Sequence, residues 1–345
     1  MIKINKNIIF SYTKKPKIIA EISGNHNGSK KKFLKLIKSA FLNGADLVKI
    51  QTYEPDDITL NNKNNNFKIK NGIWKNKYLW DLYKKACTPF KWHADAFKIA
   101  KKFNKILFSS PFSIRAVDFL ESFNVPLYKI ASFEITDYKL IKYIASKKKP
   151  IIISTGMASL GEIKEAIKII NQFHNKIIIL HCVSGYPTKL EDTNLNKIKI
   201  LKKNFKKHLI GISDHTSGLI SSIASIPLGV VAIEKHYKLN DKINTTDSKF
   251  SITPKDLLEM KNINENLNIS LDKKQKINVE SNSKKLRRSI FAIKDIKKGE
   301  KFNYLNIDTL RPKIGLSASK YFFLIGKKSK MNIKIGMPIK KNHLK

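Results

Sequence analysis

Short apolar runs rich in β-branched residues alternate with amphipathic stretches along most of this chain, and this alternation most constrains its fold. The stretches carry apolar residues three and four positions apart, as in Phe33, Ile37 and Phe41, which is typical of a helix with one buried face. Apolar strands separated by such helices predict a parallel sheet covered by helices. The eight runs lie at residues 18–22, 47–51, 106–110, 127–132, 151–155, 177–182, 209–213 and 230–235.

Eight strand-and-helix units favour a closed (β/α)₈ TIM barrel, a fold that typically takes about 250 residues. An open, doubly wound sheet is the alternative. The first apolar run is not followed by the glycine-rich G-x-G-x-x-G turn of dinucleotide-binding sheets, and eight units exceed the usual number in that fold. We therefore expect a barrel, with reactive groups where strands end and loops begin.

Two segments depart from this alternation. Residues 52–92 are long for a strand-to-helix connection and carry the aromatic residues Trp74, Tyr78, Trp80 and Tyr83, which indicates a role in substrate recognition. Near the C-terminus, a polar stretch precedes three segments with glycine turns that we predict to be short strands, at residues 288–292, 295–300 and 335–339. We predict a barrel over 1–270, a linker over 271–286 and a small β-rich domain over 287–345.

The formal net charge of +40 raises the possibility of a nucleic-acid-binding protein. However, only four of the 67 basic residues are arginines, the residue that duplex readers favour for its bidentate geometry. The lysines are also spread along the whole chain, which indicates a general composition bias. We expect no nucleic-acid partner, and a steep salt-dependent affinity for duplex DNA would contradict this expectation.

Other class markers point to a cytoplasmic enzyme without a membrane partner. No apolar window approaches the roughly 18 residues of a membrane helix. The N-terminus has no apolar run of the kind that forms a signal peptide. The two cysteines, Cys87 and Cys182, are too few for a disulfide framework.

Polar residues gather at the predicted C-terminal ends of the strands, which meet at one mouth of a barrel. Any single polar residue at a strand end is unremarkable, but the set as a whole indicates an active site. Its members are Glu21, Lys49, Gln51, Ser109, Ser110, Lys129, Ser132, Glu134, Ser154, Thr155, Tyr186, Ser213, Asp214, His215, Glu234 and His236.

Lys49 and Lys129 follow apolar neighbours near the ends of two strands, so we expect both ammonium groups to point inward. Buried ammonium groups need an anion, and a phosphate or carboxylate substrate supplies one. Structural ion pairs with Glu21 and Glu134 are the alternative. A Schiff-base lysine is a further possibility, because burial lowers the pKa of an amine.

His215 and His236 end the last two predicted strands, which are neighbours in a barrel, so both imidazoles can reach one divalent ion. Two histidine ligands leave positions for water or substrate oxygens. The alternative is that the two histidines have only structural roles.

At these positions the chain resembles the sialic acid synthase (NeuB) family. The resemblance covers nearly the whole chain and rests on long motifs at residues 19–28 (IAEISGNHNG), 44–53 (GADLVKIQTY), 109–112 (SSPF), 129–134 (KIASFE), 154–157 (STGM), 186–188 (YPT), 211–215 (GISDH) and 234–236 (EKH). Residues 72–74 (GIW), 82–86 (LYKKA), 88–93 (TPFKWH) and 247–251 (DSKFS) are similar to the pseudaminic acid branch. Residues 310–312 (LRP) and 315–316 (GL) resemble the family's antifreeze-like (SAF) domain.

The resemblance implies condensation of phosphoenolpyruvate with 2,4-diacetamido-2,4,6-trideoxy-altrose and water, giving pseudaminic acid and phosphate by C–O cleavage. It implies a divalent ion (Mn²⁺, Mg²⁺ or Co²⁺) on His215 and His236, which activates the aldehyde. It also implies a homodimer in which the SAF domain swaps and lends an arginine to the partner's mouth. N-acetylneuraminate or legionaminate synthesis is the alternative within the family, and a Schiff-base aldolase is the alternative outside it.

The resemblance also assigns roles to single residues. Phosphoenolpyruvate is held by Lys49, Ser110, Lys129, Ser132, Ser154 and Ser213. Glu134 is the candidate general base for water, while Glu21 and Gln51 position the sugar or the water. The sugar contacts are Tyr186, Asp247 and Arg311. Ser184 departs from the family, which commonly has a phosphate-binding asparagine at this position.

Overall fold

The computed structural model of the chain describes residues 1–242, 244–271 and 279–345. It divides into two compact units, Met1–Leu271 and Asp272–Lys345. The predicted linker at 271–286 partly falls on residues 272–278, which lie outside the described residues. The rest of it is helical, in α10 (Val279–Ser283) and the 3₁₀ turn η8 (Lys284–Leu286).

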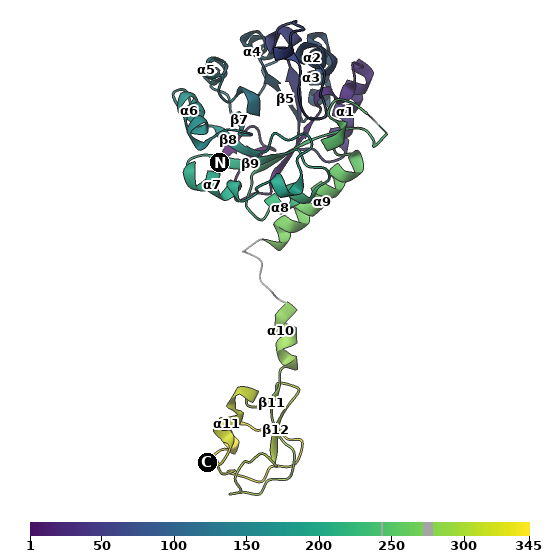
Figure 1. The fold of residues 1–345 in the computed structure, drawn as a ribbon. Helices are drawn as coiled ribbons and strands as arrows, with labels where there is room; N and C mark the ends of the chain where they lie inside the picture. Colours follow the sequence, from purple (N-terminus) through teal and green to yellow (C-terminus); the bar gives the residue numbers. More distant parts are fainter. Residues whose placement is uncertain (243, 272–278) are drawn as a thin grey trace. The chain divides into compact units, whose positions relative to one another are not determined.

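Eight parallel strands of the described chain form a closed barrel in the order β10-β3-β4-β5-β6-β7-β8-β9 (Figure 1). This confirms the predicted TIM barrel. The strands are β3 (Lys17–Glu21), β4 (Leu47–Thr52), β5 (Ile106–Pro111), β6 (Tyr128–Ile130), β7 (Ile151–Ser154), β8 (Ile177–Cys182), β9 (Leu209–Asp214) and β10 (Ala232–His236).

Helices connect successive strands and surround the barrel (Figure 1). Several begin with a side-chain cap, such as Ser159 and Thr253, whose hydroxyls accept a hydrogen bond from the third helical residue. The helices are α1 (Lys30–Leu42), α3 (His93–Lys102), α4 (Ile114–Glu121), α5 (Tyr138–Ser146), α6 (Leu160–Asn171), α7 (Lys197–Asn204), α8 (Ile220–Ser225) and α9 (Pro254–Ser270).

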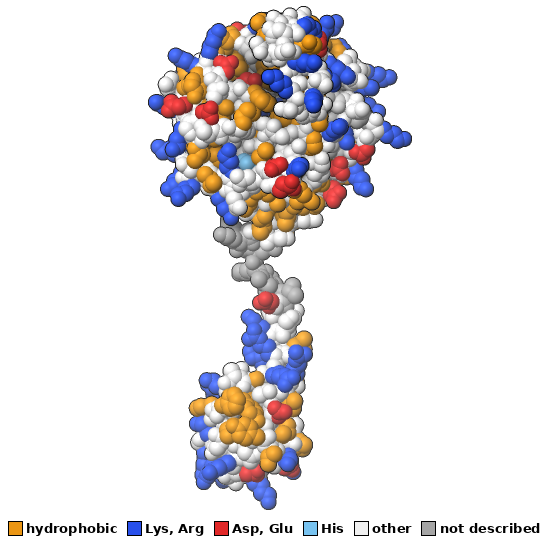
Figure 2. Space-filling model, viewed as in Figure 1, with side chains coloured by type: hydrophobic (Ala, Val, Ile, Leu, Met, Phe, Trp, Pro, Cys, Tyr) orange, Lys and Arg blue, Asp and Glu red, His pale blue; other side chains and the backbone are white. Residues whose placement is uncertain are grey.

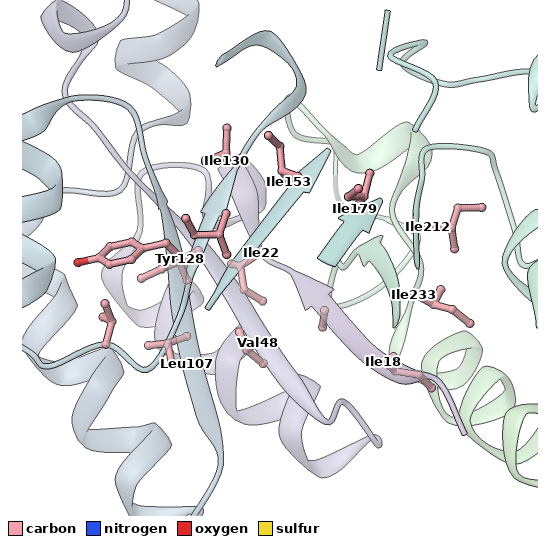
Figure 3. Packing of buried hydrophobic residues seen from close by; sticks show 14 of the residues in the cluster. Ile18, Ile22, Val48, Leu107, Tyr128, Ile130, Ile153, Ile179, Ile212 and Ile233 are labelled. Atoms are coloured by element: carbon pink, nitrogen blue, oxygen red, sulfur yellow. The ribbon is translucent and has the colours of Figure 1, made fainter. Parts of the chain in front are cut away.

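Side chains alternate between the two faces of each barrel strand. One set packs outward against the helices, and Figure 3 shows its members Ile18, Val48, Ile153 and Ile233 among others. The other set points into the barrel and is apolar in its lower part: Ile19, Leu47, Ile106, Phe108, Leu127, Ile152, Ile178, Leu180 and Leu209. The same alternation therefore delivers the next inward positions, nearer the strand ends, to the mouth.

A short hairpin at the N-terminus belongs to the interior of the barrel and was not predicted. Its strands are β1 (Ile2–Lys3) and β2 (Ile9–Phe10), and its apolar residues Ile2, Ile8 and Phe10 join the inward-facing cluster. The hairpin thus contributes to the apolar filling below the site.

The long segment after β4 has its own local structure. It contains the 3₁₀ turns η2 (Pro55–Asp57), η3 (Asn65–Phe67) and η4 (Phe90–Trp92), the helix α2 (Leu79–Ala86) and an antiparallel bridge between Lys68 and Tyr78. This is more structure than a flexible loop would have, so the segment can present a fixed surface.

The second unit is a small β-rich domain with its own core. Its strands β11 (Ser289–Ala292) and β12 (Ile307–Leu310) pair antiparallel, and α11 (Tyr321–Leu324) follows. The predicted strand at 288–292 is present, but those at 295–300 and 335–339 are wrong. These segments form only isolated bridges, Ile296 with Ile333 and Phe291 with Pro338. The core residues are Ile290, Ala292, Ile296, Phe302, Ile307, Leu324, Ile333 and Ile339.

Basic side chains are scattered over the face of the barrel unit seen in Figure 2, among neutral and acidic residues. This distribution fits a general lysine bias better than a built nucleic-acid surface. Within the described residues, no helix is long and apolar enough to cross a membrane.

Candidate active site

The C-terminal ends of the barrel strands surround a cavity of about 390 Å³. Predicted site residues that line this cavity come from six strands and the loops that follow them: Lys49, Gln51, Lys129, Ser132, Glu134, Ser154, Tyr186, Ser213, His215, His236 and Asp247. Of the other predicted residues, Glu21 and Ser110 are buried at the ends of β3 and β5. Arg311 is exposed in the second unit, next to β12.

A larger hollow of about 680 Å³ lies between α6 and α7. It is lined mainly by surface lysines and amides, such as Lys168 and Asn171, and contains none of the buried charges of the mouth. Surface lysines are abundant in this chain, so the hollow carries no comparable chemical signal.

The two predicted lysines meet at a shared carboxylate inside the mouth. Lys49 Nζ lies 2.9 Å from Glu234 Oε1 and 3.2 Å from Glu21 Oε2. Lys129 Nζ lies 3.6 Å from the same Glu234 oxygen. Both lysine side chains are almost fully buried, and both ammonium groups point inward as predicted. The alternative prediction was that these lysines form ion pairs with Glu21 and Glu134. Glu21 is a partner of Lys49, but the second carboxylate is that of Glu234 and not that of Glu134.

These contacts shift the pKa values of the four groups in different directions. Burial opposes the charge of Lys49, but the carboxylates of Glu21 and Glu234 raise its pKa above the ordinary value. Burial and the nearby Lys49 lower the pKa of Lys129 to about 8, although Glu234 acts against them. Burial opposes the charge of Glu234, but both lysines hold its pKa at about 2. Burial raises the pKa of Glu21.

Serine hydroxyls surround the lysine pair. The Oγ atoms of Ser110 and Ser154 are buried and have no hydrogen-bond partner among the residues that the structure describes. Ser213 Oγ donates to Glu234 at 3.0 Å, and Ser132 Oγ accepts from the backbone N–H of Gly156 at 3.1 Å. Buried hydroxyls are rarely left unsatisfied, so the two free ones indicate a place for a ligand oxygen.

Gly156 keeps this part of the mouth open. A Cβ atom at this position would lie 2.1 Å from Ser184 Oγ and 2.9 Å from Ser132 Oγ. Any larger residue would therefore displace hydroxyls that face the cavity.

His215 and His236 stand side by side on β9 and β10, with ring centroids 5.3 Å apart. Each Nδ1 is held by a neighbour: His215 Nδ1 lies 3.0 Å from the carbonyl oxygen of Val183, and His236 Nδ1 lies 2.7 Å from Ser23 Oγ. Neither Nε2 atom has a hydrogen bond within the described ranges, which leaves both available as ligands.

The imidazole pair fits one divalent ion. Two rings that bind one ion through Nε2 can have centroids up to about 6.5 Å apart, because the metal–nitrogen distance is about 2.1 Å. Burial lowers the pKa of His236 well below the ordinary value, which keeps the ring neutral as a metal ligand must be. The described residues contain no group of three or more His, Cys, Asp or Glu side chains suited to a metal. The remaining positions would fall to water or substrate.

Glu134 stands alone on the other side of the cavity. It ends the 3₁₀ turn η5 (Ser132–Glu134), and its buried Oε2 has no hydrogen-bond partner in the described part of the chain. Burial raises its pKa to about 7, and the charge of Lys129 offsets this only in part. A carboxylate with this pKa can take up a proton near neutral pH, as a general base must.

Glu21 and Gln51 form a fixed pair below this space. Gln51 Nε2 donates to Glu21 Oε1 at 3.1 Å, and the backbone N–H of Ser23 donates to the same oxygen at 3.0 Å. This arrangement suits positioning more than proton transfer.

Tyr186 and Asp247 lie on the side of the histidines. The Tyr186 ring is 4.5 Å from that of His215 and 5.5 Å from that of Trp74. Asp247 Oδ2 accepts from the backbone N–H of Gly24 at 3.1 Å. The predicted sugar contacts of the barrel unit therefore share one edge of the cavity, while Arg311 belongs to the other unit.

Sequence reasoning missed two kinds of site residue. Ser23, which orients His236, lies just beyond a strand end and gave no signal beyond its place in a motif. The apolar lining of the cavity was not foreseen, apart from Trp74 and Tyr83 of the predicted aromatic cluster. The other two members of that cluster lie elsewhere: Trp80 donates to Asp56, and Tyr78 packs under Lys63.

Comparison with known proteins agrees with this arrangement. Residues 36–276 match the NeuB family and residues 287–345 match the SAF domain. The chain is 41% identical to a pseudaminic acid synthase of Campylobacter jejuni over 335 residues, which is 96% of this chain and 97% of that protein. It is 42% identical to one of Helicobacter pylori over 334 residues, covering 94% and 96% of the two chains.

More distant relatives also match over most of their own length. An N,N'-diacetyllegionaminic acid synthase of Campylobacter jejuni is 36% identical over 93% of this chain and 98% of its own. A crystal structure of N-acetylneuraminic acid synthetase from Leptospira borgpetersenii, in complex with citrate, superposes with a TM-score of 0.73 at 28% identity. That match covers 81% of this chain and 93% of the other. The matched family model, the high coverage and the identity of these relatives together show that the chain belongs to the NeuB family and carries a C-terminal SAF domain.

Proposed function

We propose that this chain is a pseudaminic acid synthase. It condenses phosphoenolpyruvate with the open-chain form of 2,4-diacetamido-2,4,6-trideoxy-β-L-altropyranose and with water, and it releases pseudaminic acid and phosphate. The relatives of highest identity named above carry this activity in their names, at 41% and 42% identity over nearly the whole chain.

The observation that carries the proposal is the charge arrangement in the mouth. Lys49 and Lys129 are buried beside Ser110 and Ser154, whose hydroxyls have no partner among the described residues. Phosphoenolpyruvate has a phosphate and a carboxylate, which together match two ammonium groups and several hydroxyl donors. Ser132, in η5, and Ser213, on β9, add two more hydroxyls to the lining of the cavity.

The chemistry follows from this placement. The C3 carbon of phosphoenolpyruvate forms a bond with the aldehyde carbon, which leaves positive charge at C2. Water adds to C2, and the C2–O bond to phosphate then breaks, with phosphate leaving with the bridging oxygen. Glu134 takes the proton of the attacking water, because its pKa of about 7 allows it to be ionised at neutral pH.

His215 and His236 are the residues that would hold a divalent ion. When bound, such an ion (Mn²⁺, Mg²⁺ or Co²⁺) supplies Lewis-acid polarisation of the aldehyde oxygen. The hydrogen bond that His215 Nδ1 donates to the carbonyl oxygen of Val183, and the one between His236 Nδ1 and Ser23 Oγ, fix both rings so that their Nε2 atoms stay free for this role.

Phosphate release tests the proposal directly. We expect release only when phosphoenolpyruvate and an acceptor sugar are both present, and fastest with the diacetamido sugar of the pseudaminic series. A panel with N-acetylmannosamine and the legionaminic acid precursor tests the two alternatives within the family. Oxygen-18 in the bridging position should appear in phosphate, and its retention in the keto acid would contradict C–O cleavage.

A Schiff-base aldolase is the second candidate, and one observation favours it. The pKa of Lys129 is lowered to about 8 by burial and by Lys49, so a fraction of this amine is neutral at neutral pH. Treatment with pyruvate and borohydride separates the candidates, since only an imine is reduced to a stable adduct. We expect no adduct, because Glu234 lies near the ammonium group and favours its charged form.

The proposal includes a homodimer in which Arg311 reaches the mouth of the partner subunit. Mixing two inactive variants tests this: Arg311→Ala keeps a complete barrel mouth, and Lys129→Met keeps a complete SAF domain. If the domains swap, mixed dimers recover part of the activity, because one mouth receives every group. If each SAF domain serves its own barrel, mixing restores nothing.

A further inference from the structure

The cavity has one side that the reaction chemistry does not use. Above the ends of β4, β5 and β6, the loops that follow these strands give it an apolar lining, with no acidic or basic side chain among the members. We call this surface the apolar wall. It consists of Ile58, Ile69, Trp74, Leu79, Leu82, Tyr83, Phe112 and Phe133.

The position of the apolar wall follows from the barrel topology. Most of its members belong to the segment after β4, while Phe112 follows β5 and Phe133 follows β6. In the closed strand order, β5 and β6 lie across the barrel from β9 and β10, which carry His215 and His236. Phe112 and Phe133 therefore face the imidazoles across the cavity, while Trp74 extends the wall to Tyr186 on the side of the histidines.

Contacts within the chain hold the apolar wall in place. The Tyr53 ring is buried and lies 5.1 Å from Phe112 and 6.0 Å from Tyr83. Trp74 Nε1 donates to the carbonyl oxygen of Thr246 at 3.1 Å, which links the wall to the loop after β10. The wall is thus a preformed surface, as ligand sites usually are.

A free polar group lies beside this surface. Thr246 lines the same cavity, and its buried Oγ1 has no hydrogen-bond partner among the described residues. An apolar surface next to one unsatisfied hydroxyl matches the two ends of an acetamido group, a methyl and an amide.

The simpler interpretation is that these side chains only pack against each other as a secondary core. Leu82 fits it, with 8% of its surface exposed. Ile58, Ile69 and Leu79 do not, because they are only partly buried and border the cavity. Water against such a surface is unfavourable, so a ligand with apolar groups gains free energy there.

We propose that the apolar wall and the Thr246 hydroxyl form a subsite for the part of the acceptor sugar beyond its aldehyde, with Thr246 between the imidazoles and the wall, and that this subsite selects sugars with a second acetamido group and a deoxy terminal carbon. The inference rests on the proposed function. With its aldehyde near the imidazoles, an open-chain sugar places its last carbons toward the other side of the cavity. Hydroxyl groups at those carbons would lose their water against apolar side chains.

Selectivity between two acceptors tests the inference. We would measure kcat/KM for the diacetamido-trideoxy sugar and for N-acetylmannosamine in the wild type, Ile69→Asn and Thr246→Val. Leu60→Asn is the matched control, because Leu60 lies in the same segment, is 66% exposed and does not line the cavity. Thr246→Val keeps the side-chain shape and carries the test if Ile69→Asn does not fold.

We expect both test variants to lower kcat/KM for the diacetamido sugar about 10-fold or more, the range for lost contacts in a specificity pocket. The KM for phosphoenolpyruvate, kcat/KM for N-acetylmannosamine and the Leu60→Asn control should stay within about threefold of their unperturbed values. Equal losses on both sugars, or a wild-type preference for N-acetylmannosamine, would overturn the inference. Absence of phosphate release with every acceptor would instead overturn the proposed function.

Discussion

Glu134 offers the sharpest test of the proposed chemistry, because its environment sets both a rate and a pH range. Its carboxylate borders the cavity, and burial raises its pKa to about 7 while the charge of Lys129 offsets this only in part. As the base that accepts a proton from the attacking water, it should contribute roughly 10²- to 10⁴-fold to the rate. We therefore predict that Glu134→Gln lowers kcat by a factor in this range.

The pKa also fixes the shape of the pH profile. With a value of about 7, the fraction of Glu134 that is ionised is about one tenth at pH 6 and about nine tenths at pH 8. The kcat/KM for phosphoenolpyruvate should therefore rise roughly tenfold between these pH values, since this parameter reports the free enzyme. The phosphate of the substrate titrates near pH 6 and adds its own, separate acid limb.

Continuous phosphate-release measurements between pH 5.5 and pH 9 separate the two titrations. In Glu134→Gln the limb near pH 7 should disappear, while the limb that belongs to the substrate remains. Glu191→Gln makes the same chemical change at a side chain that is 73% exposed, and it should leave the profile unaltered. If the limb near pH 7 persists in Glu134→Gln, or if kcat falls less than threefold, another group is the base.

The same pKa shift makes a prediction about stability. The folded-state pKa of Glu134 lies above its ordinary value of 4.5, so the folded state binds this proton more tightly than the unfolded state. The protonated form therefore supports folding fully at low pH, and this support is lost as pH rises through about 7. Glu134→Gln should be more stable than the wild type by about 3 kcal/mol at pH 8, and by much less at pH 5.

Urea unfolding at the two pH values measures this difference independently of activity. A variant that is slower yet more stable at pH 8 would show that the carboxylate is kept for function at a cost to the fold. Equal stability of the two proteins at both pH values would contradict the raised pKa itself.

Three further predictions concern other parts of the barrel. Lys235→Met should lower the free energy of unfolding by about 3–5 kcal/mol, because it leaves Asp214 buried and unpaired. Lys168→Met, at an exposed ion pair, should lower it by at most about 1 kcal/mol. Urea unfolding compares the two variants. Gly156→Ala should raise the KM for phosphoenolpyruvate more than it lowers kcat, because its Cβ would displace two serine hydroxyls that face the cavity. EDTA should abolish phosphate release, and added Mn²⁺ should restore it. A titration followed by the electron paramagnetic resonance of Mn²⁺ should show that His236→Ala binds the ion more weakly than the wild type does. A rate of phosphate release that EDTA leaves unchanged would refute the metal role.

The barrel could be predicted because its strands are buried on both faces. Such strands read as continuous apolar runs, and each predicted run overlaps an observed strand with ends that differ by at most two residues. The inward direction of Lys49 and Lys129 followed from the same pattern, since alternate residues of a strand share a face. The local sequence is sufficient to predict these features, because the run of apolar residues and the two-residue alternation of a strand are both visible in it.

Other parts depend on contacts that leave no local pattern. The N-terminal hairpin has strands of two residues, which are too short to show a period. In the second unit, the segments at 295–300 and 335–339 contain glycine turns and form only isolated bridges. The apolar wall gathers side chains from a mostly irregular segment, where spacing along the chain does not indicate which residues face a common cavity.

One partner of the buried lysines was also beyond prediction: Glu21 was expected, but Glu234 was not, since its contacts depend on which strands lie close across the barrel. Glu234 meets Lys49 and Lys129 because β10 stands close enough to β4 and β6 across the narrow interior of the barrel. Glu134 was the expected partner from its place near a strand end. It lies at the end of η5, beyond β6, instead, and this separation leaves its pKa raised and its carboxylate free to act as a base.

The ion pairs in the mouth are compatible with a site that binds an anionic substrate, because the two buried lysines need negative charges beside them whether or not the substrate is present. Two ammonium groups buried without counter-charge would be costly, so Glu21 and Glu234 stabilise the mouth when no substrate is present. A purely structural ion cluster would also satisfy the polar groups around it. Ser110 and Ser154 keep buried hydroxyls without partners among the described residues, directly at the strand ends beside this cluster. These unsatisfied donors favour a site built for an additional anion over one built for stability alone.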